Sequence, residues 1–122
     1  MSITRIASGG PYEAKIGYCR SVVANGFVFV SGCTGEGVDV VAQCRSALER
    51  IERALTEAGA GMADVVRVTY MLPEHGEFEA CWPLLREAFG DHPPAATMIE
   101  CGLIAPQFRI EIEVTAVLPS AA

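Results

Sequence analysis

Near its N-terminus the chain reads YCRSVVANGFVFVSGC over residues 18–33, and the rest of the architecture follows from this segment. Two apolar runs flank Asn25-Gly26, a dipeptide that readily adopts the positive φ angles of a type I′ turn. The segment therefore predicts a β-hairpin. Its second strand is apolar at every position from Phe27 to Val30, so we expect that strand to be covered on both faces.

Four chemically distinct side chains fall together at the open end of this hairpin. Under the register that a two-residue turn sets, strict alternation places Tyr18, Arg20, Ser31 and Cys33 on one face. A phenol, a guanidinium, a hydroxyl and a thiol in this arrangement could bind a small anion. The alternative is that Arg20 is solvated or pairs with a carboxylate and that the cluster has no ligand.

Two segments have the apolar periodicity of amphipathic helices. Residues 40–58 place apolar side chains at helical spacing, with Gln43 among the polar side chains of the opposite face and Gly59 as a left-handed cap. Residues 78–89 form a second helical pattern, in which Pro83 has to lie near the first turn.

Three further segments are predicted as strands, at residues 65–72, 95–100 and 108–117. The last alternates strictly, with Glu111 and Glu113 on its polar side. The order of elements predicts an α+β domain in which two helices cover one face of a mixed sheet. The other face has to meet water or another subunit, and the apolar run in the hairpin favours a subunit.

Composition sets the class of the protein. The 122 residues and 13.0 kDa suit a single domain over residues 1–122. A net charge of −6 disfavours binding to nucleic acid. With neither a long apolar run nor a secretory signal, we expect no membrane association and a cytoplasmic location. The five scattered cysteines suit neither a disulfide framework nor a zinc site, and we expect no metal.

Short motifs recur along nearly the whole chain: Ile16-Gly-Tyr18, Val28-Phe-Val-Ser-Gly32, Ala42-Gln43, Leu55-x-x-Ala58-Gly59, Asp64-Val65-Val66, Pro94-Ala95 and Ile110-Glu-Ile-Glu113. In this order, the motifs resemble the YjgF/RidA family of enamine/imine deaminases, often labelled L-PSP endoribonucleases.

The resemblance implies a chorismate-mutase-like fold assembled as a homotrimer. In such a trimer, three sheets enclose a central barrel and a small cavity lies at each subunit interface. The implied chemistry is hydrolysis of a 2-imino acid to a 2-keto acid and ammonia, without metal or organic cofactor. An arginine binds the substrate carboxylate, and a glutamate positions the attacking water.

Carried over by position, the glutamate is Glu111, and Tyr18 and Ser31 line the cavity. The arginine does not carry over, because Ala96 stands in its place. Met98, two residues further along, is expected in the same cavity. The chain thus resembles an arginine-less branch of the family.

Arg20 is the candidate replacement for that arginine, because the hairpin register places it beside Ser31; the alternative is an Arg20 that pairs with an interface carboxylate. Cys33 could be a reactive thiol, although a packed, passive cysteine is the simpler interpretation.

Three functions remain open at this point. The first is a hydrolase of reactive enamine or imine metabolites, or of a related small metabolite. The second is a trimeric protein that binds a small carboxylate or another metabolite without turnover. The third is a ribonuclease, disfavoured because His75 and His92 are the only histidines and fall in expected loop or helix-entry segments.

Overall fold

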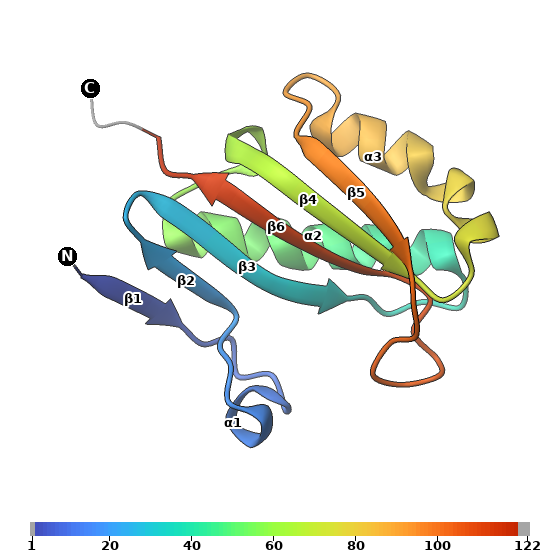
Figure 1. Ribbon diagram of the computed structural model, residues 1–122, viewed down its shortest axis with the longest axis horizontal. Helices are drawn as coiled ribbons and strands as arrows, with labels where there is room; N and C mark the ends of the chain where they lie inside the picture. Colours follow the sequence, from blue (N-terminus) through green and yellow to red (C-terminus); the bar gives the residue numbers. More distant parts are fainter. Residues whose placement is uncertain (1, 120–122) are drawn as a thin grey trace.

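The computed structural model describes residues 2–119, and its centre is a six-stranded mixed sheet with strand order β1-β2-β3-β6-β4-β5 (Figure 1). The strands are β1 (Ile3–Ile6), β2 (Ser21–Ala24), β3 (Phe27–Thr34), β4 (Val65–Leu72), β5 (Ala95–Glu100) and β6 (Glu111–Val117). The helices are α1 (Glu13–Ile16), α2 (Val40–Ala58) and α3 (Trp82–Phe89), with 3-10 turns at Met62–Asp64, His75–Glu77 and Glu79–Cys81. The predicted α+β fold class is confirmed.

The hairpin forms around the predicted turn. Asn25 and Gly26 have φ angles of 52° and 81°, as a type I′ turn requires. Ala24 pairs with Phe27, and Val22 pairs with Phe29. The predicted register is therefore confirmed throughout β2.

A β-bulge interrupts β3 just beyond that point. Val30 pairs with Val114 of β6, but the next pair joins Cys33 to Ile112, so two residues of β3 stand opposite one of β6. The extra residue reverses the alternation, and Cys33 is fully buried in the core with Val30. The prediction that Cys33 shares a face with Ser31 is therefore wrong, because strict alternation does not hold across a bulge.

Helix α2 begins and ends where its sequence signals predict. The carboxylate of Asp39 accepts a hydrogen bond from the Ala42 N–H at 2.8 Å and caps the first turn. Gly59 ends the helix with a φ of 91°.

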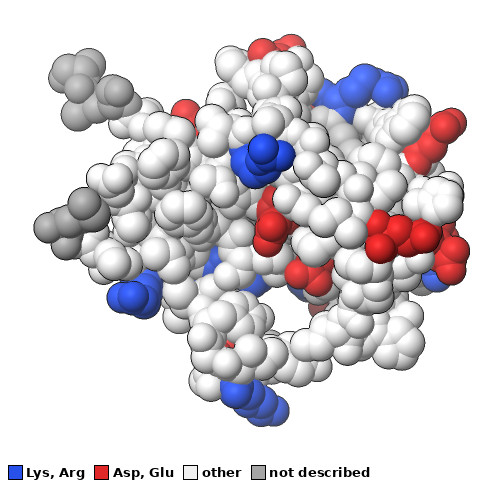
Figure 2. All heavy atoms as spheres, viewed as in Figure 1, with Lys and Arg blue, Asp and Glu red and all other residues white. Residues whose placement is uncertain are grey.

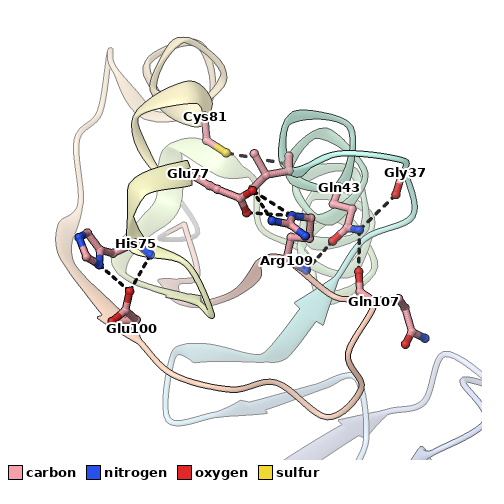
Figure 3. Close-up of polar contacts among 9 residues, drawn as sticks. Gly37, Gln43, His75, Glu77, Cys81, Glu100, Gln107 and Arg109 are labelled. Atoms are coloured by element: carbon pink, nitrogen blue, oxygen red, sulfur yellow. Dashed lines mark hydrogen bonds and ion pairs between the residues drawn. The ribbon is translucent and has the colours of Figure 1, made fainter.

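Gln43 departs from the predicted helix pattern, because it is buried rather than on the polar face. Its amide nitrogen donates to the Gly37 and Gln107 carbonyls, both at 3.1 Å, and its amide oxygen accepts from the Arg109 N–H at 2.8 Å (Figure 3). Three backbone partners satisfy the amide inside the protein, so its polarity does not require solvent.

Two other elements begin later than predicted. Helix α3 starts at Trp82 rather than residue 78, with Pro83 in its first turn and a 3-10 turn before it. Strand β6 starts at Glu111 rather than residue 108. The Arg109 N–H is bonded to Gln43, so it is not available to the strand ladder.

The two faces of the sheet differ. Helices α2 and α3 lie on one face (Figure 1). On the other face, Phe27 and Phe29 are 39% and 46% exposed, with ring centroids 6.0 Å apart. Within one chain, β3 is thus covered on one face only. None of the helices within residues 2–119 has the length and apolar character needed to cross a membrane.

Candidate functional site

A cavity of about 850 Å³ opens where β3 ends and β6 begins. Four predicted site residues line it together: Tyr18, Arg20, Ser31 and Glu111. Residues 8–18, which we call the strap, form another wall, and Figure 1 places the strap and the loop between β5 and β6 on the same, lower side of the sheet. Figure 2 shows a hollow on this side, with acidic and basic side chains above it.

Arg20 is held by neutral groups. Its Nη2 donates to the Gly32 carbonyl at 3.1 Å, its Nη1 donates to the Cys33 Sγ at 3.4 Å, and its Cζ lies 5.7 Å from the centroid of the Tyr18 ring. Its Nε is buried without a hydrogen-bond partner, and none of the ion pairs formed within residues 2–119 includes Arg20. The guanidinium is therefore positioned beside the cavity with a charge that no direct ion pair compensates.

Glu111 lies against the bulge of β3. A Cβ added at Gly32 would overlap the Glu111 carboxylate, so the close approach depends on glycine at this position. Burial raises the pKa of Glu111, and the nearby Glu113 carboxylate raises it further, whereas Arg20 opposes the shift. A carboxyl group with a raised pKa is better matched to proton transfer near neutral pH.

The remaining hairpin residues have different surroundings. The Ser31 hydroxyl donates to the Cys19 carbonyl at 2.7 Å, while Tyr18 is 38% exposed. Burial raises the pKa of Cys33 despite the nearby Arg20, and its thiol donates to the Ser31 carbonyl at 3.4 Å. A raised pKa lowers the thiolate fraction, so these surroundings favour a passive thiol over a nucleophile.

Ala96 and Met98 do not join this cavity within one chain. They lie on the edge strand β5, where they pair with Val68 and Tyr70 of β4 on the helix-covered face. Ala96 lines a second cavity instead, of about 450 Å³, between β5 and α3. Tyr18, Arg20, Ser31 and Glu111 thus line one cavity and Ala96 lines the other, whereas Cys33 and Met98 line neither.

Glu13 is a residue that the sequence analysis missed. It is 6% exposed, and its carboxylate accepts hydrogen bonds from the Ser8 N–H at 3.0 Å, the Ser8 hydroxyl and the Gly10 N–H at 3.1 Å. Its carbonyl accepts from the Tyr18 N–H at 3.0 Å. Glu13 therefore joins both ends of the strap. The Gly-Gly-Pro turn at residues 9–11 was the available signal for a folded segment here.

A separate set of polar contacts holds the loop before β6. Arg109 donates from Nε to the Glu77 carboxylate at 2.8 and 3.1 Å and also from Nη2, while His75 contacts Glu100 through its N–H at 2.8 Å and its ring (Figure 3). Neither His75 nor His92 lines either cavity. Within residues 2–119, no group of three histidine, cysteine or acidic side chains is placed to hold a metal ion.

Comparison with known proteins identifies the family. A family model described as "Endoribonuclease L-PSP" matches residues 10–118. A RutC family protein of Pyrococcus abyssi is 33% identical over 107 residues, which are 81% of this chain and 84% of that protein. The chain belongs to the YjgF/RidA family. A RutC family protein of Haemophilus influenzae is 31% identical over 116 residues, which are 91% of this chain and 89% of that protein.

The YjgF/RidA fold is equally clear among solved structures. The crystal structure of a YjgF/YER057c/UK114 family member from Mycobacterium tuberculosis superposes with a TM-score of 0.93 at 41% identity. The superposition covers 96% of this chain and 100% of the Mycobacterium tuberculosis chain. The family resemblance stated from the sequence motifs is confirmed.

Proposed function

We propose that this chain is a small-molecule hydrolase that converts 2-imino acids, formed from enamines, to 2-keto acids and ammonia. The observation that supports it most is Glu111, a carboxyl group with a raised pKa that lines the same cavity as Arg20. Glu111 accepts a proton as water attacks the imine carbon. That proton passes to the nitrogen and gives a carbinolamine. The carbinolamine hydroxyl then loses its proton to the nitrogen through Glu111 as the C–N bond breaks, so the 2-keto acid forms and ammonia leaves.

Arg20 takes the role of the carboxylate-binding arginine that Ala96 replaces. Its uncompensated charge and unpartnered Nε support this assignment. We expect Arg20→Ala to weaken the binding of small 2-keto acids by about ten- to a hundredfold, since hydrogen bonds to charged groups contribute about 1.5–3 kcal/mol. Arg53→Ala is the matched control, because Arg53 lines the same cavity from helix α2 rather than from the hairpin. Unchanged affinity in Arg20→Ala would rule out this role.

The working form is a homotrimer in this proposal. Two observations support a second copy: the exposed aromatic side chains Phe27 and Phe29 on the uncovered face of the sheet, and the separation of Ala96 and Met98 from the Glu111 cavity. In an assembly, β5 of one copy would close the cavity of the next. The cytoplasmic location expected from the sequence stays a prediction.

The test of catalysis is ammonia release from freshly generated 2-aminoacrylate. We expect release above the spontaneous rate, and a loss of about a hundredfold or more in Glu111→Gln, because general acid–base groups contribute about 10²–10⁴-fold. Glu49→Gln is the control, since Glu49 is an exposed carboxylate on α2 that lines neither cavity. Spontaneous rates with the unmodified protein, or equal rates in both variants, would contradict the proposal.

The second candidate is a trimeric binding protein without turnover, and alanine at position 96 favours it. Binding of 2-keto acids without ammonia release would support this alternative. A ribonuclease has less support, because both histidines lie outside the cavities and the chain carries a net charge of −6. We therefore propose neither nucleic acid nor a membrane as a partner.

A further inference from the structure

The cavity around Ala96 has the character of an apolar ligand pocket. Its volume is about 450 Å³, within the range of small-molecule sites. Its walls come from α3, from the turn that follows α3, and from the sheet. The main apolar and aromatic lining residues are Tyr70, Trp82, Leu85, Phe89, Pro93 and Pro94.

Polar groups are few in this lining. Tyr70 is 5% exposed, and burial raises the pKa of its hydroxyl, so it lines the cavity as a neutral phenol. Arg86 is the one charged lining residue, and it is exposed. In a pocket of this kind, the binding free energy comes from burying the apolar surface of the ligand rather than from ion pairs with it.

Size distinguishes between possible occupants. An apolar cavity of about 150 Å³ suffices to bind benzene. The cavity at Ala96 is about 450 Å³ and is open to solvent on one side, where Trp82 is 44% exposed. An aromatic ring with several further carbons can therefore lie in it, whereas a methyl or methylene group leaves most of the volume to water. An arginine in place of Ala96 would occupy much of this space.

We propose that this cavity binds the side chain of the substrate, and that the substrate is a 2-imino acid with an aromatic or branched aliphatic side chain. The inference rests on the proposed function, in which β5 of one copy meets the Arg20 cavity of the next. The carboxylate then binds at Arg20, and the side chain lies between Trp82 and Phe89. Alanine at position 96 thereby selects larger substrates than 2-aminoacrylate.

Trp82 provides a direct measurement of binding, since it is the chain's single tryptophan and lines the cavity. We expect 3-phenylpropionate, which cannot be hydrolysed, to change Trp82 emission saturably, and propionate to have no effect at the same concentration. Ala96→Arg should abolish the response to 3-phenylpropionate, and Ala96→Leu should weaken it. Ala63→Arg, at an exposed alanine outside both cavities, should keep it.

Activity separates this inference from the proposed function. We expect ammonia release to be at least tenfold faster from the imine of phenylalanine than from 2-aminoacrylate, with the order reversed in Ala96→Arg. No response of Trp82 to 3-phenylpropionate, or the same response in Ala96→Arg, overturns the inference even if 2-aminoacrylate is hydrolysed. A saturable response that Ala96→Arg removes, without ammonia release from any imine, supports the pocket and contradicts the hydrolase.

Discussion

Gly32 and Glu111 together define the polar wall of the larger cavity. The missing side chain of Gly32 leaves room for the Glu111 carboxylate, and the carbonyl of the same glycine accepts a hydrogen bond from Arg20. One backbone position thus places a carboxylate and a guanidinium beside each other without a direct ion pair.

Gly32→Ala tests this close approach. We expect it to lower the free energy of unfolding by only about 0.5–1 kcal/mol, because the added methyl group overlaps the end of the flexible Glu111 side chain, which can shift into the cavity that it lines. Urea denaturation measures the change. Gly102→Ala is the matched control, since a Cβ there meets no atom within 4 Å. Equal stability of the two variants would show that Glu111 does not need Gly32.

Glu111 also predicts a pH dependence of stability. Because its folded-state pKa is raised above the usual value of about 4.3, the folded chain holds this proton more tightly than the unfolded chain. Its contribution to stability is therefore greatest below that value and falls as the pH rises through the folded pKa.

We expect Glu111→Gln to gain stability relative to the unmodified protein between about pH 4 and pH 7. Urea denaturation at both ends of this interval measures the gain. Glu113→Gln removes a neighbouring like charge and should move the fall in stability to lower pH. A difference between Glu111→Gln and the unmodified protein that stays constant with pH would contradict the assignment.

The success of the sequence analysis at individual residues depended on local chemistry. The Asn25-Gly26 turn fixes the register of the hairpin, so the proximity of Tyr18, Arg20 and Ser31 follows from it. The burial of Cys33 and Gln43 does not follow from such local rules. A bulge adds a residue without a sequence signal of its own, and the partners of Gln43 are backbone groups that only the tertiary fold brings near.

At the scale of elements, the strap combines a weak secondary structure with strong side-chain contacts. Helix α1 has only four residues, too few to be stable alone. The hydrogen bond from Ser8 is the main cause that lowers the pKa of Glu13, and the backbone donors act in the same direction. This contribution to stability is present above the unfolded pKa of Glu13 and is lost as the pH falls through the folded value.

Glu13→Ala should open the strap without unfolding the sheet. Lys15, the chain's only lysine, lies exposed in α1, so we expect trypsin to cut after it several times faster in this variant. Mass spectrometry of early time points identifies the cut. Glu57→Ala, at a carboxylate that lines the cavity outside the strap, should leave the rate unchanged. Equal cleavage in both variants would show that the carboxylate does not hold the strap.

The boundaries of elements were harder to predict than their existence. The 65–72 and 95–100 strands and helix α2 match their predicted ranges because turn residues or a cap flank them. The first turn predicted for α3 is a 3-10 helix, and the first residues predicted for β6 form a loop, because Arg109 bonds to Gln43 and Glu77. Long-range contacts determine where α3 and β6 begin, and the apolar periodicity of the sequence does not indicate such contacts.

For the whole molecule, the uncovered face of the sheet predicts self-association. We expect the purified protein to sediment at three times the 13.0 kDa chain mass. Phe29→Asp should shift it towards monomers, because a carboxylate cannot be buried unpaired against an apolar face. Glu49→Arg, on the exposed side of α2, should leave the sedimentation unchanged. Sedimentation of the unmodified protein as a monomer would contradict the shared site.

The bulge in β3 has a consequence for changes in chain length. Deleting Ser31 would remove the extra residue while still allowing Val30 to pair with Val114 and Cys33 with Ile112, as in a regular ladder. The core would then keep its packing. Arg20, however, would lose the backbone geometry that now holds its guanidinium beside the cavity. Deleting this one residue would therefore test whether folding and ligand binding depend on different parts of β3.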